Sequence, residues 1–113
     1  MVSACGGSGD GAGNPLQPPP GPPVTAATVS IVDNSFGPPS VKVVSGGTVT
    51  FAWNPANMQQ HNVRWGTVPA GTMPPNGPTQ ATGSPFEVTF TMFGSYQYVC
   101  TLHTGMEGIV FVE

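Results

Sequence analysis

Short runs of alternating apolar and polar residues constrain the fold of this chain more than any other feature. The clearest run covers 48–53 and places Val49, Phe51 and Trp53 on one face, because successive side chains of a strand point to opposite faces. None of the runs has a helical period, and Ser-Gly-Gly at 45–47 is typical of a turn. Comparable runs cover 28–32, 40–44, 85–91, 96–100 and 108–112. The pattern predicts an all-β fold, an antiparallel Greek-key β-sandwich of about seven to eight strands.

The low charge of the chain excludes some classes of partner. Only 6% of the 113 residues are charged and the net charge is −3, whereas binding to nucleic acid requires a basic surface. We therefore expect no nucleic-acid partner and no charge-driven binding to an anionic membrane. No apolar run approaches the about 18 residues that a membrane-spanning helix needs, so neither such a helix nor a full signal peptide is expected.

The first 23 residues differ in composition from the rest of the chain. They begin Gly/Ser-rich and become Pro-rich, which is typical of a flexible linker followed by a semi-rigid one. We expect a disordered tether at 1–23 and a single folded domain at 24–113. Within the tether, residues 2–6 (Val-Ser-Ala-Cys-Gly) resemble the lipobox of bacterial lipoproteins. A lipid anchor on Cys5 is therefore the only membrane contact that we expect.

Four side chains are candidates for holding a metal ion. Cys100, His103 and Met106 follow one another in the spacing Cys-x-x-His-x-x-Met, and His61 is the only other histidine. One thiolate, two imidazoles and one thioether form the ligand set of a mononuclear copper site that transfers single electrons, because these ligands together bind both Cu(I) and Cu(II). Since Cys100 ends one predicted strand and His61 begins another, the four side chains can meet at one end of the sandwich.

Other uses of these residues stay open at this point. A buried cysteine or methionine is commonly part of a core, and the same ligands would suit a copper carrier. A binding module with zinc would need Glu107 or water in place of Met106. A hydrolase could use Cys100 as its nucleophile and a histidine as its base, but no orienting third residue or glycine elbow is evident. We therefore expect no enzymatic activity.

Residues 26–113 resemble the plastocyanin/azurin-like cupredoxins, which are small blue copper proteins. The resemblance rests on three motifs: Phe51-Ala52-Trp53 leading to His61-Asn62-Val63, Phe90-x-x-x-Gly94-x-Tyr96-x-Tyr98-x-Cys100, and Cys100-x-x-His103-x-x-Met106-x-Gly108. The short loop from cysteine to methionine is most similar to that of amicyanin. The resemblance implies that His61, Cys100 and His103 are equatorial copper ligands and that Met106 is a weak axial ligand.

The resemblance also implies how the site is supported and approached. Asn62 would connect its segment to Thr101 by hydrogen bonds, and His103 would be the solvent-facing ligand through which electrons pass. An apolar docking face would surround it, formed by Leu102, His103, Thr104, Gly105 and Met58, with Met73 as a further candidate. Redox partner proteins would dock there transiently. We expect a monomer in the periplasm or on the surface of a bacterium.

Overall fold

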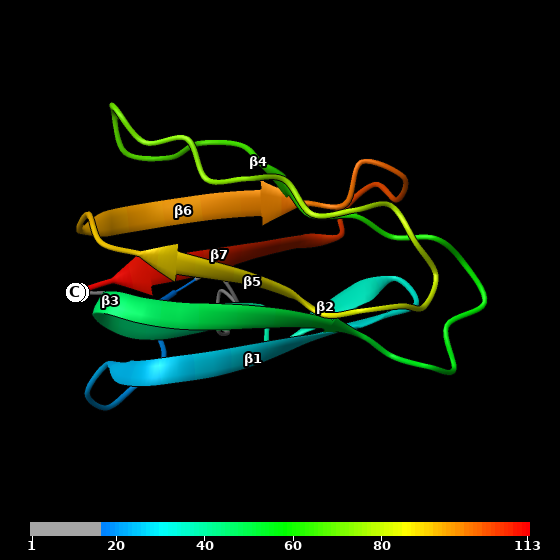
Figure 1. Cartoon of the computed structure of the whole chain (residues 1–113), viewed down its shortest axis with the longest axis horizontal. Helices are drawn as coiled ribbons and strands as arrows, with labels where there is room; N and C mark the ends of the chain where they lie inside the picture. The colour runs from blue at the N-terminus through cyan, green and yellow to red at the C-terminus, as the bar shows by residue number, and fades with distance from the viewer. Residues whose placement is uncertain (1–16) are drawn as a thin grey trace.

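The computed structural model describes residues 17–113 and shows an all-β fold (Figure 1). Its seven strands are β1 (Val24–Val32), β2 (Ser35–Gly37), β3 (Ser40–Trp53), β4 (Arg64–Trp65), β5 (Phe86–Phe90), β6 (Gly94–Val99) and β7 (Glu107–Val112). Within 17–113 there is no helix of the length and apolarity needed to cross a membrane. The all-β fold class predicted from the alternating runs is confirmed.

Strand β3 joins the two layers of a sandwich. Its C-terminal half pairs with β1 on one side and with β5 on the other, so that Thr50 lies between Thr28 and Glu87. Its N-terminal half pairs with β7, and at Val43 also with β1. From β7 the sheet continues through β6 to β4. One layer therefore contains β1, β3 and β5, and the other contains β7, β6 and β4 (Figure 1).

Residues 45–47 form a kink within β3, where a turn was expected from Ser-Gly-Gly. Gly46 has a φ of 88°, and β1 pairs in parallel with Val43 before the kink and with Thr48 after it. Strands β3 and β7 are also parallel, whereas the other strand pairs are antiparallel. The pairing is thus mixed where purely antiparallel pairing was expected, because the chain keeps its direction through the kink. The kink also lets β3 leave one layer and enter the other.

Aromatic side chains fill the space between the layers. Phe51 of β3 meets Tyr98 of β6 edge to face with ring centroids 5.2 Å apart, and Phe36 of β2 meets the same tyrosine at 4.8 Å. A Cβ atom at Gly108 of β7 would lie 2.3 Å from the Tyr98 ring, so only glycine leaves room for it. Because dense packing fixes the position of β6, the chain leaves this strand at Val99 in a defined direction.

The first strand begins at Val24, next to the predicted boundary between tether and domain. Residues 17–23 contain no strand. Cys5 and most of the predicted tether at 1–23 lie outside the described residues, so the tether and its lipid anchor stay predictions.

Candidate metal centre

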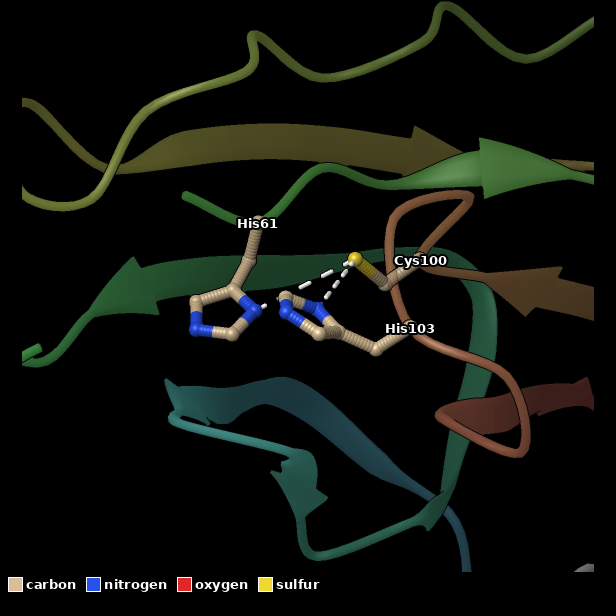
Figure 2. Close-up of side chains that lie close together, drawn as sticks. All are labelled: His61, Cys100 and His103. Atoms are coloured by element: carbon tan, nitrogen blue, oxygen red, sulfur yellow. Dashed lines mark hydrogen bonds between the residues drawn. The ribbon is translucent and has the colours of Figure 1, made fainter. Parts of the chain in front are cut away.

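Three side chains that could hold a metal ion converge at one end of the sandwich (Figure 2). Cys100 directly follows β6, His103 lies in the loop before β7, and His61 lies between β3 and β4. The Cys100 sulfur is 4.0 Å from His61 Nδ1 and 3.5 Å from His103 Nδ1, and one donor atom from each residue lies within 4.8 Å of the other two. Both imidazoles thus present the same ring nitrogen to the thiol.

A tight loop returns the chain from Cys100 to Met106. The Cys100 N–H donates to the Met106 carbonyl at 3.0 Å, and the Met106 N–H donates to the His103 carbonyl at 3.3 Å. Gly105 has a φ of 84°, a conformation that suits glycine. The Met106 side chain is buried in the same cluster as Cys100. The spacing therefore folds the thioether residue back beside the thiol residue.

The backbone of His61 is held by three hydrogen bonds. Its N–H donates to the Gln80 carbonyl at 3.0 Å, and its carbonyl accepts from the Gln80 N–H at 3.1 Å and from the Trp53 indole at 3.0 Å. His61 forms an isolated bridge with Gln80, and the strand expected to begin at His61 begins at Arg64. The His61 side chain is completely buried, so its orientation is decided by the folded protein and not by solvent.

The Pro-rich segment 66–84 supplies this bridge and covers β4. The Gly77 N–H donates to the Val63 carbonyl at 3.0 Å, and the Trp65 indole donates to the Pro75 carbonyl at 2.7 Å. The segment thus runs beside the chain that leads from His61 into β4. The segment therefore helps to hold His61 in place. Its Gly/Pro-rich composition did not indicate this role.

Asp33 contacts His61, although no sequence motif singled it out. Its Oδ1 lies 2.8 Å from His61 Nε2, and its carboxylate accepts hydrogen bonds from the N–H groups of Met58 at 3.0 Å and Gln59 at 3.2 Å. The Met58 N–H, followed by the imidazole, holds the pKa of the Asp33 carboxyl below its usual value. An ionised carboxylate only accepts hydrogen bonds, so the ring nitrogen that faces Asp33, His61 Nε2, is the donor in this contact.

Asn62 connects the His61 segment to the ligand loop, which comprises residues 100–106. Its Nδ2 donates to Thr101 Oγ1 at 2.9 Å, and the Thr101 N–H donates to Asn62 Oδ1 at 2.9 Å. A longer bond of 3.3 Å joins Asn62 Nδ2 to Thr79 Oγ1. Because the Asn62 side chain is almost fully buried, water cannot readily replace these bonds. They hold residues 61 and 100 in a fixed relation across the site.

The residues predicted to form the docking face reach solvent: Met58, Leu102, Thr104 and Gly105 are exposed, and His103 is partly exposed. Met58 is 88% exposed and Leu102 is 50% exposed. Met73 is elsewhere: it lines a groove with Met92 beside the start of β6, whereas Cys100 follows the end of that strand. Met73 is therefore not part of the candidate docking face.

The two distances from the Cys100 sulfur to the histidine nitrogens are close to those of a small trigonal metal site. Bonds of about 2.0–2.3 Å from a metal to nitrogen or sulfur, at trigonal angles, place two donors about 3.5–3.7 Å apart. The separations of 3.5 and 4.0 Å found here are close to that range. Among residues 17–113 no carboxylate joins the group, and Glu107, which the zinc alternative required, is exposed on β7. A thiolate with a buried thioether residue nearby suits copper better than zinc.

Curated relatives are similar to this chain over most of its length. Amicyanin-alpha of Methylorubrum extorquens is 32% identical over 91 residues, which are 80% of this chain and 75% of the relative. Plastocyanin of Prochlorothrix hollandica is 35% identical over 103 residues, with 80% of this chain and 77% of the relative covered. These similarities agree with the resemblance that the sequence motifs indicated.

Solved structures and a family model give the same assignment. A reduced Cu(I) form of an amicyanin variant is similar with a TM-score of 0.65 and 35% identity, covering 78% of this chain and 82% of that one. The copper-containing nitrite reductase of Thermus scotoductus has a TM-score of 0.68 and 27% identity, but only 28% of its chain is covered. The model of the copper binding proteins of the plastocyanin/azurin family matches residues 24–113. The chain therefore belongs to the plastocyanin/azurin family of copper binding proteins.

Proposed function

We propose that the protein is a mononuclear type 1 (blue) copper protein that shuttles single electrons between redox partners outside the cytoplasm. The observation that carries this proposal is the convergence of Cys100 Sγ with the Nδ1 atoms of His61 and His103 at one end of the sandwich. Bound copper supplies a one-electron Cu(II)/Cu(I) couple. The protein holds the donor atoms in place, so that little rearrangement accompanies the change in oxidation state.

His61, Cys100 and His103 are the strong equatorial ligands in this proposal, and Met106 is the weak axial one. The assignment is supported by the distances between the three donor atoms and by the burial of Met106 beside them. Asn62 and Thr101 fix the relation between the two segments that carry the ligands. Rigid outer contacts of this kind orient metal ligands.

Electrons enter and leave through His103, which is the partly exposed histidine. The docking face around it consists of Met58, Leu102, His103, Thr104 and Gly105, and none of these residues carries a fixed charge. Contacts of this kind over a small area give short-lived encounters, which suit a monomer that exchanges electrons with several partners. A tether at 1–23 with a lipid on Cys5 would keep the domain near a bacterial membrane, and mass spectrometry of the native membrane fraction tests that part.

The central test is the visible spectrum after Cu(II) is added to the apo-protein. We expect an intense blue or green band from charge transfer between thiolate and copper, and the Cys100→Ser variant should lack it because an alcohol oxygen replaces the sulfur. Thr104→Ala is a matched control, since it removes a hydroxyl from the same loop without removing a donor. A colourless wild-type product would overturn the proposal.

A second candidate function is copper transport outside the cytoplasm with the same ligands. The observation that favours it is the thioether of Met58, which is almost fully exposed on the segment leading to His61 and could pass on Cu(I). Cyclic voltammetry separates the two functions. Reversible waves with retained copper support electron transfer, and release of Cu(I) on reduction supports the carrier. The nitrite reductase similarity is limited to 28% of that enzyme's chain, so we propose no substrate chemistry.

A further inference from the structure

We propose that Asp33 is a positioning residue of the metal centre, which fixes the His61 tautomer that presents Nδ1 to the copper and places a negative charge behind this ligand. The inference rests on the proposed electron-transfer function for its redox consequence. The charge favours Cu(II) over Cu(I), because Cu(II) carries the larger positive charge. Asp33 would therefore lower the reduction potential of the site.

The tautomer argument follows from the contacts of the His61 ring. Nε2 lies 2.8 Å from Asp33 Oδ1, whereas Nδ1 faces the sulfur of Cys100. If the ring proton were on Nδ1, the Nε2 lone pair would face a carboxylate oxygen at hydrogen-bond distance, and the two would repel each other. The His61 ring is completely buried, so bulk water offers no alternative partner.

Asp33 is itself anchored, which makes it a fixed reference for the ring. Backbone N–H groups of Met58 and Gln59 occupy its two oxygens. Asp33 lies directly after the end of β1. Two residues earlier, the Ile31 carbonyl accepts a hydrogen bond from the Asn54 N–H at 2.9 Å. The turn that carries Asp33 is therefore joined to the segment that leads to His61. A flexible surface carboxylate would not have three donors arranged around it in this way.

No lysine or arginine of residues 17–113 neutralises the charge of Asp33. Within 17–113 the basic group at contact distance is the imidazole of His61, which is uncharged in this tautomer, and neither Lys42 nor Arg64 pairs with Asp33. The Arg64 guanidinium donates instead to the carbonyls of Val63 and Gly77. The Asp33 side chain is 32% exposed, so solvent weakens its field without removing it.

Two substitutions separate the hydrogen bond from the charge. In Asp33→Asn an amide oxygen can still accept from His61 Nε2, but the charge is gone. In Asp33→Ala both are lost. Glu107→Gln is the control, because it removes an equal charge from an exposed residue directly after Met106, which pairs with Val99 at the end of β6 that leads to Cys100.

The first readout is the ratio of Cu(II) to Cu(I) affinity, measured as the midpoint potential by voltammetry. We expect this ratio to fall about tenfold in both Asp33 variants, which is a rise of about 59 mV for one electron. The Glu107→Gln variant should change the ratio by less than about threefold, because its side chain is solvated and screened. Equal shifts in Asp33→Asn and Glu107→Gln would overturn the electrostatic part of the proposal.

The second readout is the His61 tautomer in the apo-protein, measured by two-bond proton–nitrogen NMR at mildly alkaline pH. Wild type and Asp33→Asn should show the proton on Nε2 alone, and Asp33→Ala should show a mixture. A wild-type proton on Nδ1, or an unchanged tautomer in Asp33→Ala, would overturn the positioning role. If Asp33→Ala does not fold, the wild-type tautomer and the Asp33→Asn potential still decide the question. Failure of the wild type to form the coloured copper complex would overturn the proposed function separately, because the tautomer is measured without metal.

Discussion

The two histidines of the candidate metal centre lie in opposite surroundings, although both turn Nδ1 towards the same sulfur. His61 is completely buried and is held through its backbone by Trp53 and Gln80 and through its ring by Asp33. His103 is partly exposed on the ligand loop, beside the half-exposed Leu102. One site can therefore be rigid on one side and accessible on the other. The core and its polar contacts fix one side, and a short loop presents the other side to solvent.

Replacing each histidine by alanine in the apo-protein should give the largest difference. His61→Ala should lower the free energy of unfolding by about 2–4 kcal/mol, because it opens a buried cavity and leaves Asp33 without its ring partner. His103→Ala should change it by less than about 1 kcal/mol, since its side chain is partly exposed. Urea denaturation of both metal-free variants measures this. Similar losses in the two variants would show that the contrast between buried and exposed sides is wrong.

Asn62→Ala tests the link between the two sides. The substitution removes the paired hydrogen bonds with Thr101 and leaves buried partners unsatisfied, so we expect a loss of about 1–3 kcal/mol in the free energy of unfolding. Copper should also leave the variant faster, because the His61 segment and the ligand loop are no longer tied together. Stopped-flow removal of copper by a chelator measures that rate. Thr104→Ala, on the exposed part of the same loop, should match wild type in both measurements.

Met106→Leu tests what the buried thioether at the end of the ligand loop contributes to stability and to the reduction potential. Leucine has a similar volume, so the free energy of unfolding should change by less than about 1.5 kcal/mol. The coloured band from Cys100 should remain, while the reduction potential shifts because a weak axial donor is lost. Absorption and voltammetry on one sample measure both effects. Loss of all copper binding would mean that Met106 is a strong ligand.

Tyr98→Phe should have the smallest effect at neutral pH, and it tests whether the core that positions Cys100 needs the hydroxyl. The Tyr98 hydroxyl is buried with no hydrogen-bond partner in the described structure, so its removal should stabilise the fold by at most about 1 kcal/mol. Copper binding should not change. A clear loss of stability would show that the hydroxyl has a partner after all.

The same tyrosine gives a pH dependence with a definite sign. Burial raises the pKa of Tyr98, because the phenolate is poorly solvated in the core. In the unfolded chain the hydroxyl ionises near its ordinary value of about 10, so unfolding releases a proton above that pH and stability falls as pH rises. The fall from this group should approach about 1.4 kcal/mol per pH unit, and Tyr98→Phe should lack that part. Urea denaturation at several alkaline pH values measures the slope.

Much of the site was predictable because its chemistry is local in the sequence. The Cys-x-x-His-x-x-Met spacing places Cys100, His103 and Met106 in one short loop, whatever the rest of the chain does. The alternating runs similarly predicted strands, since a period of two residues is a property of extended backbone itself. Asp33 could not be predicted in this way. It lies 28 residues before His61, and an isolated acidic residue in a turn has no spacing that marks it as a partner.

The sequence by itself determined the strand content, the candidate donor side chains and the family, because these depend on residue types and short spacings. Tertiary structure alone decided which strands pair in parallel, since a Ser-Gly-Gly segment can either reverse the chain or kink it, and only packing of β3 in both layers selects the kink. Tertiary structure also decided that Met58 lies near the metal end while Met73 does not, and that Asp33 is the carboxylate in contact with His61. Those contacts join segments far apart in the chain, and their energies exist only after the layers have packed.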